Sequence, residues 1–343
     1  MKKYDIIFIE VIFMINIIIP YYNNRGTIER ALHSIAMQTY KNRTIVTIVD
    51  DCSTEKYLDK FFDFLENKFS DLNLQFLKTN YNQGPGGARN YGLLKNLCDW
   101  VIFMDADDAF CSSIAVEFMY KEAAKNNAVM LSTSFWDQHE NGIYKRSEKN
   151  FTWLHGKIFN ANFLRFNRIF FPERMNEDSA FIMKIRGLAD NIYTLDFTSC
   201  IWMNNKKSIT RSDKNYYLKY AKDFLENYYD VCYFFDTCKN VKNKDALLIE
   251  MLNVFYYQRK ELLFLLKKAE NKSNKKDIGN ELKEYDKVLK KFLKYNKIKT
   301  KITNKNFVKE MINFEKNHRF ETPSNTKGNK NTEENVVNFY KNI

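Results

Sequence analysis

The sequence contains few of the residues on which several common kinds of site depend. There are only four histidines and six cysteines among 343 residues, and no two cysteines form a C-x-x-C pair. No histidine lies at zinc-site spacing from a cysteine, so the usual structural zinc sites are excluded. Nothing resembles a Ser–His–Asp catalytic set. We expect six reduced thiols in a cytoplasmic protein.

The chain also lacks a long apolar segment. The best one, residues 6–19, is interrupted by Glu10 and Asn16. It falls short of the roughly 18 apolar residues that a membrane-spanning helix needs. No small-residue cleavage site follows it, so a signal peptide is not favoured. We interpret residues 1–13 as a leader that precedes the folded domain.

The net charge of +12 is unevenly distributed. Residues 1–213 contain 26 Lys and Arg against 25 Asp and Glu, whereas residues 214–343 contain 28 against 17. The excess therefore belongs to the second part, and charge alone does not indicate a nucleic-acid partner. We expect an α/β domain over residues 14–213, an α-helical region over 214–320 and a disordered tail over 321–343.

The first hundred residues alternate between two hydrophobic periods. Residues 15–19 form a continuous apolar run closed by Pro20, which is typical of a buried parallel strand. Helix and strand patterns then alternate, at residues 27–38, 44–49, 55–69, 72–77, 88–97 and 100–104. This alternation predicts a mostly parallel sheet with helices on both faces. In such sheets ligands bind beyond the carboxyl ends of the strands.

The second half of the chain has a different pattern. Residues 151–211 combine short aromatic strands with one helix near 178–188. Beyond Asp213 the sequence predicts three or four helices, including 216–235, 246–268 and 278–298. The last of these has an apolar stripe and a lysine-rich reverse side. Packing against neighbouring helices is the favoured interpretation of the stripe, and docking on an anionic membrane is the alternative.

Acidic residues gather at the predicted strand ends. Asp105 and Asp107 follow the strand 100–104 and can present oxygens to one cation, which for such ligands is Mn²⁺ or Mg²⁺. A solvated acidic turn is the usual interpretation of an isolated D-x-D. The nearby pairs Asp50-Asp51 and Glu177-Asp178 favour the cation, because so many carboxylates at one edge would repel one another.

Two further segments have candidate roles. Residues 83–90 join a strand to a helix, and their glycines and Arg89 suit a diphosphate, although a plain turn is the alternative. No G-K-[ST] follows, so this is not a P-loop. Asp178 is the candidate general base for an acceptor hydroxyl. An acid that only stabilises a helix N-terminus is its simpler interpretation, and the two are compatible.

These segments together resemble the family-2 glycosyltransferases over residues 14–212. The resemblance lies in the order and spacing of several short motifs: residues 17–23 (IIIPYYN), 38–40 (QTY), 49–54 (VDDCST), 82–90 (NQGPGGARN), 103–108 (FMDADD), 157–159 (KIF), 177–178 (ED) and 208–210 (SIT). Two departures occur in one motif, where Cys52 replaces the usual glycine and the acidic residue shifts to Glu55. The 130 C-terminal residues match no family pattern.

The resemblance implies a GT-A fold and an inverting, metal-dependent glycosyltransferase. The implied nucleotide-sugar-binding residues are Pro20, Tyr22, Asn23, Asp51, Gly87, Arg89 and Asp105. Asp105 and Asp107 would hold the metal, and Asp178 would be the base. The acceptor side would include Trp153, His155, Lys157 and Glu177, with a packed histidine as the alternative for His155. The donor would be a nucleoside-diphosphate sugar, expected to be UDP-linked.

The acceptor is a glycan, a lipid-linked glycan or a protein, and the protein is expected in the cytoplasm, with peripheral contact at the inner face of an anionic membrane. A nucleotidyltransferase is one alternative, although its glycine-rich loop usually follows the first strand directly. A noncatalytic protein that retains the fold is another, and the presence of Asp107 and Asp178 argues against it.

Overall fold

The computed structural model describes residues 15–140, 142–148, 152–205, 216–242, 244–270 and 272–296. The leader, the segment 208–210 and the expected tail therefore lie outside the described residues. The strands are β1 (Ile15–Tyr21), β2 (Thr44–Asp50), β3 (Asn73–Lys78), β4 (Trp100–Phe103), β5 (Ala109–Phe110), β6 (Met130–Gln138), β7 (Tyr144–Ser147), β8 (Lys157–Asn160) and β9 (Ile192–Trp202). All six cysteines are free, as expected.

The helices of the α/β part are α1 (Arg25–Ala36), α2 (Leu58–Lys68), α3 (Gly84–Lys95), α4 (Ala115–Lys125), α5 (Ala161–Phe166) and α6 (Glu177–Leu188). Three longer helices follow, α8 (Tyr216–Thr237), α9 (Lys244–Lys268) and α10 (Lys272–Tyr295). The predicted strands and helices of the first hundred residues are therefore confirmed, with small changes at their ends.

One mixed sheet is the centre of the described structure, with strand order β3-β2-β1-β4-β8-β6-β9-β5 and β7 paired to β6. The first four strands in this order are parallel, whereas β8 is antiparallel to both β4 and β6. The strand order reverses at β1, because β2 lies on one side of it and β4 on the other. The carboxyl ends of β1 and β4 therefore border the crevice where ligands bind in open α/β sheets.

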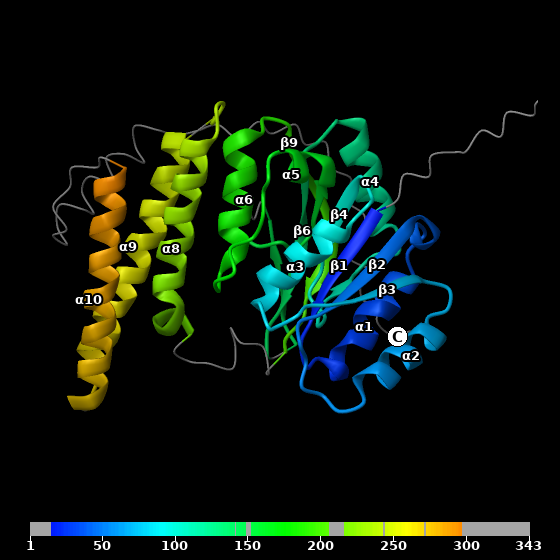
Figure 1. Ribbon diagram of the computed structural model, residues 1–343, viewed down its shortest axis with the longest axis horizontal. Helices are drawn as coiled ribbons and strands as arrows, with labels where there is room; N and C mark the ends of the chain where they lie inside the picture. The colour runs from blue at the N-terminus through cyan, green and yellow to red at the C-terminus, as the bar shows by residue number, and fades with distance from the viewer. Residues whose placement is uncertain are drawn as a thin grey trace, which may run out of the picture.

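Both faces of the sheet are covered (Figure 1). One core contains apolar residues of α1, α2 and α4 packed on the sheet, and the other contains those of α3, α5 and α6. β1 is buried on both faces, which explains its continuous apolar run. The two-sided covering confirms the layered α/β prediction.

Helix α3 begins earlier than the sequence pattern indicated. It starts at Gly84 rather than Ala88, with Pro85 in its first turn, where a proline's missing N–H costs nothing. A Cβ at Gly86 would lie 2.5 Å from the carbonyl oxygen of Pro172. Glycine is therefore needed here because the helix start approaches another backbone segment closely.

The helical region packs on α6. Its apolar core includes Ala180 and Met183 of α6 together with residues of α8, α9 and α10. Tyr285, Leu289 and Phe292, from the apolar stripe of α10, are buried in this core. The packed interpretation of that stripe is confirmed. The predicted domain boundary near residue 213 stays a prediction, because α6 belongs to two cores at once.

Candidate functional site

The site lies beyond the carboxyl end of β4, where three segments meet. The loop Asp105–Asp108 follows β4, Arg89 projects from α3, and Glu177 and Asp178 open α6. Arg89 Nη2 lies 2.6 Å from Asp105 Oδ1, and its Nη1 lies 2.5 Å from Glu177 Oε1 and 3.3 Å from Asp178 Oδ1. One buried guanidinium therefore joins carboxylates from two segments.

The charges of this cluster depend on one another. Burial opposes the charge of Arg89, but the adjacent carboxylates outweigh burial and raise the pKa of its guanidinium. Burial and the neighbouring Asp178 raise the pKa of Glu177 to about 7, although Arg89 acts against them. Burial also raises the pKa of Asp178, and this effect outweighs the positive charges of Arg89 and His155, which act to lower it. A carboxylate with a raised pKa is a stronger proton acceptor when ionised, which suits a general base.

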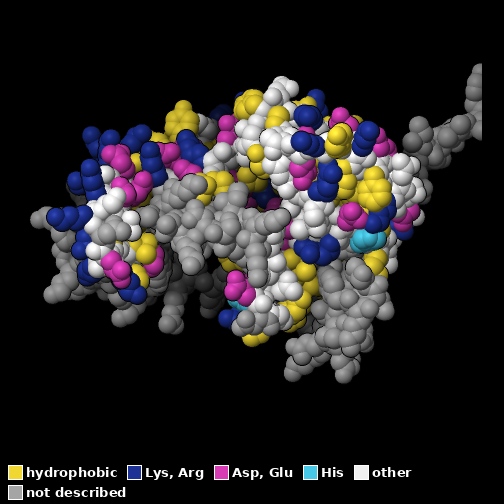
Figure 2. Space-filling view, turned by 90° about the horizontal axis from the view of Figure 1, so that it is seen from below, with side chains coloured by type: hydrophobic (Ala, Val, Ile, Leu, Met, Phe, Trp, Pro, Cys, Tyr) yellow, Lys and Arg dark blue, Asp and Glu magenta, His cyan; other side chains and the backbone are white. Residues whose placement is uncertain are grey.

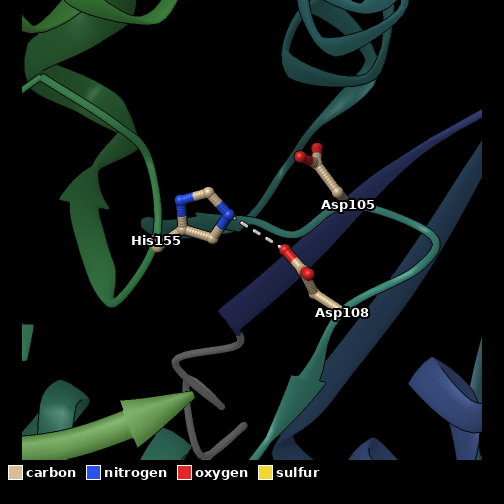
Figure 3. Close-up of side chains that lie close together, drawn as sticks. All are labelled: Asp105, Asp108 and His155. Carbon is tan, nitrogen blue, oxygen red and sulfur yellow. Dashed lines mark ion pairs between the residues drawn. The ribbon is translucent and has the colours of Figure 1, made fainter. Parts of the chain in front are cut away.

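A second cluster joins Asp105 to Asp108 and His155 (Figure 3). One potential ligand atom from each residue lies within 4.8 Å of those of the other two. His155 Nε2 is 3.0 Å from Asp108 Oδ2, and the side chains of both residues are largely buried. Burial disfavours the charged imidazole, but Asp108 and Asp105 outweigh burial and raise the pKa of His155. The three side chains can offer two oxygens and one nitrogen to a divalent cation.

Asp107, the second predicted ligand, is not part of this three-residue cluster. Asp107 Oδ2 accepts a hydrogen bond of 2.8 Å from Asn205 Nδ2, and its carbonyl oxygen accepts one of 2.5 Å from Arg30. Burial and the neighbouring carboxylates of Asp108 and Asp105 raise the pKa of Asp107 to about 6. Its role as a metal ligand stays a prediction, with Asp108 as a competitor in the same loop.

Lys157 holds the segment that carries His155 through hydrogen bonds to its backbone. Lys157 is 1% exposed, and its ammonium donates to the carbonyl oxygens of Trp153 at 2.6 Å and of His155 at 3.3 Å. Burial lowers the pKa of Lys157 to about 7. Gly156 has a φ of +66°, and a Cβ there would lie 2.6 Å from Thr133 Oγ1. Lys157 and Gly156 thus fix the turn, and His155 is both packed and paired.

Aromatic rings surround His155. The ring centroid of Trp202 lies 5.4 Å from His155 and 5.1 Å from Trp153, and that of Phe135 lies 5.0 Å from His155. Trp153 and Trp202 are both partly exposed at this edge. An aromatic pair of this kind suits a sugar ring, so Trp153 stays an acceptor-side prediction and Trp202 joins it.

The predicted nucleoside side lies at the ends of β1 and β2. Tyr22 is 49% exposed, and partly exposed Pro20 lies in β1 opposite Val49. Asn23 has a φ of 50°, and its Oδ1 accepts a hydrogen bond of 2.9 Å from the backbone N–H of Thr54. This hydrogen bond joins the loop after β1 to the loop after β2.

Asp51 connects the loop after β2 to the start of α3. Asp51 Oδ1 accepts hydrogen bonds from Thr79 Oγ1 at 3.0 Å and from the backbone N–H of Gln83 at 2.9 Å. Gly87 lies in the first turn of the same helix, where a Cβ would lie 2.3 Å from Gln83 Cβ. Hydrogen bonds therefore connect Asn23 and Asp51 to the neighbouring loops, and the binding roles of the predicted nucleoside residues stay predictions.

Sequence reasoning missed two partnerships. Asp108 was seen only as part of the acidic run, and its pairing with His155 joins positions 47 residues apart in the chain, from 108 to 155. The buried Asn227 on α8 was also missed. The one sequence signal for the pairing of Asp108 was that the fourth residue of 105–108 is also acidic. A contact between residues of different strands produces no periodic pattern in the sequence.

Comparison with known proteins finds relatives among the glycosyltransferases. The family model for glycosyl transferase family 2 matches residues 16–209. A curated relative is the poly(ribitol-phosphate) beta-N-acetylglucosaminyltransferase TarS of Staphylococcus aureus, 29% identical over 209 residues. That alignment covers 52% of this chain and 34% of TarS, so the chain spans about a third of that relative.

Two solved structures share the fold. The crystal structure of S. aureus TarS 1–349 in complex with UDP-GlcNAc has a TM-score of 0.51 and 22% identity, covering 82% of this chain and 71% of that one. The Pyrobaculum calidifontis mannosyltransferase PcManGT in complex with GDP-Man and Mn²⁺ has a TM-score of 0.54 and 16% identity, covering 83% of each chain. Such low identities establish the fold, and the predicted GT-A architecture is confirmed. The family model covers more than half of the 343 residues of this chain, so the chain belongs to glycosyl transferase family 2.

Proposed function

We propose that the protein is an inverting glycosyltransferase that moves a sugar from a UDP-linked donor to a hydroxyl group. The observation that carries the proposal is the meeting of Asp178, Arg89 and Asp105 at the end of β4. These residues provide a base, a fixed positive charge and a carboxylate within one crevice. Membership of the family argues against nucleotidyl transfer, the first alternative.

A divalent metal fits the residues of this site. Five carboxylates lie in the two acidic segments, 105–108 and 177–178, whereas Arg89 and His155 are the basic side chains that pair with them among the described residues. A mixed set of carboxylate oxygens and one imidazole nitrogen suits Mn²⁺ better than Mg²⁺. Asp105 would hold the metal with Asp108 and His155, or with Asp107 as the sequence predicted. When bound, the metal neutralises negative charge that develops on the leaving diphosphate.

The chain's own residues would carry the remaining chemistry. Asp178 accepts the proton of the acceptor hydroxyl as its oxygen attacks the anomeric carbon from the face opposite the diphosphate. The bond to the diphosphate breaks in the same step, so the configuration inverts. Arg89 keeps Asp178 in place and adds positive charge beside the leaving group. Glu177, tied more closely to Arg89, supports that guanidinium.

The donor is inferred from the relatives. TarS is named as an N-acetylglucosaminyltransferase and is solved with UDP-GlcNAc, whereas PcManGT is solved with GDP-Man. The higher sequence identity to TarS favours a uridine donor. The sugar would be a hexose or an N-acetylhexosamine, and the acceptor would be a glycan, a lipid-linked glycan or a protein.

A panel of nucleotide sugars tests the proposal. We expect UDP sugars to raise the unfolding temperature of the full chain in the presence of Mn²⁺ and to release UDP slowly. Asp107→Ala and Asp108→Asn, compared in the same assay, identify the ligand by loss of the metal dependence. Protection by no nucleotide sugar, with or without Mn²⁺, would favour a noncatalytic protein that retains the fold.

Peripheral contact of the helical region with an anionic membrane is a lesser part of the proposal. No helix among the described residues is long and apolar enough to cross a bilayer. The lysines Lys283, Lys287, Lys290, Lys291 and Lys294 of α10 are exposed. In Figure 2, however, acidic side chains are interspersed with basic ones over this region at the left of the view. Any such attraction would therefore be weak and salt-dependent.

A further inference from the structure

One face of α8 holds the segment that leads into the proposed base. Asp223, Glu226, Asn227 and Asp230 follow one another at helical spacing, so their side chains share a face of α8. This face contacts the side chain of Arg174 and the backbone of Met175 and Asn176, directly before Glu177 and Asp178 in α6. Figure 1 shows α8 beside α6.

Asn227 is at the centre of this contact. It is 0% exposed, and its Nδ2 donates to the carbonyl oxygens of Met175 at 2.9 Å and of Asn176 at 3.2 Å. Carbonyl oxygens only accept, so the orientation of the amide is fixed. Its Oδ1 accepts no hydrogen bond from any described residue. A buried acceptor without a donor is unfavourable, so this asparagine carries a cost that the two hydrogen bonds of its Nδ2 offset.

Further contacts hold the same segment on either side of Asn227. Arg174 Nε lies 3.1 Å from Glu226 Oε2, and its Nη1 pairs with Asp230. The backbone N–H of Met175 donates to Asp223. Among Asp223, Glu226, Asn227 and Asp230, Asn227 is the one residue whose side chain donates hydrogen bonds to two successive carbonyl groups.

The backbone held by Asn227 has a left-handed conformation. Asn176 has a φ of 63° and a ψ of 38°, in the region that asparagine adopts more readily than most other residues with a Cβ. Its side chain does not cap α6. This turn sets the direction in which α6 begins, and therefore where the carboxylates of Glu177 and Asp178 lie relative to Arg89. A small rotation here would move the Asp178 carboxylate away from the reacting atoms.

We propose that Asn227 is a positioning residue, through which the helical region fixes the carboxylate of Asp178. The proposal rests on the proposed function of Asp178 as the base. It gives the C-terminal helices a role in catalysis that does not involve contact with either substrate. The hydrogen bonds to residues 175 and 176 hold the start of α6 in the one conformation that aligns the base.

The test compares Asn227→Ala with Arg186→Gln in the full chain. Arg186 joins the other end of α6 to Glu250 through two hydrogen bonds of 2.6 and 2.7 Å, so its loss also weakens the contact with the helical region. UDP-GlcNAc is the donor probe. We expect Asn227→Ala to lower kcat by about ten- to a hundredfold, the range for a small misplacement of a reacting group. The Kd for UDP with Mn²⁺ should stay within about twofold, because the hydrogen bonds of Asn227 go to Met175 and Asn176 and not to the predicted nucleotide-binding residues. Arg186→Gln should leave kcat unchanged for each folded molecule.

Two further measurements separate this proposal from a general loss of structure and from failure of the proposed function. Hydrogen exchange of the peptide 174–180 should increase in Asn227→Ala and not in Arg186→Gln. Adding Asn227→Ala to Asp178→Asn should cause no further loss of kcat, because Asn227 acts through Asp178. Unchanged exchange or unchanged kcat in Asn227→Ala would overturn the proposal.

If the unmodified protein turns over no nucleotide sugar, the proposed function fails and the catalytic role of Asn227 fails with it. The exchange data still decide whether Asn227 holds the turn. If Asn227→Ala does not fold, Asn227→Leu fills the same volume and removes both donors.

Discussion

The α/β part and the helical region use their polar residues in opposite ways. At the end of β4 the α/β part buries Arg89 among carboxylates, together with Lys157 and Asp108, around a crevice. The core of α8, α9 and α10 is almost wholly apolar, and most of their charges face solvent. Helix α6 belongs to both parts, since it begins with Asp178 and packs Ala180 and Met183 in the helical core. Under the proposed function, the α/β part would supply the reacting groups and the helical region would hold them in place.

Removal of the buried guanidinium should have the largest effect on the α/β part. Arg89→Met leaves Asp105, Glu177 and Asp178 without their shared counter-charge, which we expect to lower the free energy of unfolding by about 3–5 kcal/mol. Urea unfolding of the full chain, monitored by circular dichroism, measures this change. Arg146→Met is the matched control. Arg146 pairs with Glu148 and Asp196 on the exposed surface, where the expected loss is about 1 kcal/mol or less. Equal losses in the two variants would contradict the central role of Arg89.

An added methyl group at the junction of the two parts should have a smaller effect. A Cβ at Gly187 would lie 2.2 Å from Cε1 of Phe235, so Gly187→Ala forces α6 and α8 apart. We expect the free energy of unfolding to fall by about 1–3 kcal/mol, the usual cost of overpacking. Gly279→Ala, at a position with open space, is the control and should not destabilise the protein. A stable Gly187→Ala protein would show that the two parts are less tightly joined than the structure indicates.

The pH dependence of turnover should report on Asp178. Burial raises the pKa of Asp178, and the base works only when ionised, so kcat should fall as pH drops through a value above that of an ordinary aspartate. Each further pH unit should then lower kcat about tenfold. Stopped assays at saturating donor and Mn²⁺ measure the profile, with the excess metal keeping its ligands ionised. An acid limb that persists unchanged in Asp178→Asn would belong to another group.

Charge reversal on the helical region should have the smallest effect. Changing Lys287, Lys290 and Lys294 to Glu should alter the free energy of unfolding by roughly 0.5 kcal/mol or less per site, because all three are exposed. If the membrane proposal holds, sedimentation with anionic vesicles at low salt should weaken in this variant, and in the unmodified protein at high salt. Transfer to a soluble acceptor should be unaffected. No vesicle binding by the unmodified protein at low salt would remove the membrane proposal and leave α10 as a packed helix.

The sequence predicted the parallel half of the sheet because buried parallel strands are continuous apolar runs, as in β1. It predicted α10 because a stripe at helical spacing implies a packed face. The pairing of His155 with Asp108 was not predictable, because the antiparallel addition of β8 beside β4 leaves no periodic signal. The early start of α3 was missed since glycines are usually assigned to turns. Asn227 could not be singled out, because one asparagine in a helix carries no mark of its partners.

The most direct test of the account is Asp178→Asn, measured for nucleotide binding and turnover on the same preparation. Calorimetry of UDP binding with Mn²⁺ should give a Kd close to that of the unmodified protein, because Asp178 is not among the predicted nucleotide-binding residues. Turnover of a UDP sugar should fall by about a hundredfold or more, the usual range for loss of a general base. Near-normal turnover would place the base elsewhere, with Glu177 as the next candidate. Absence of UDP binding by the unmodified protein, with or without Mn²⁺, would contradict the assignment of the whole site.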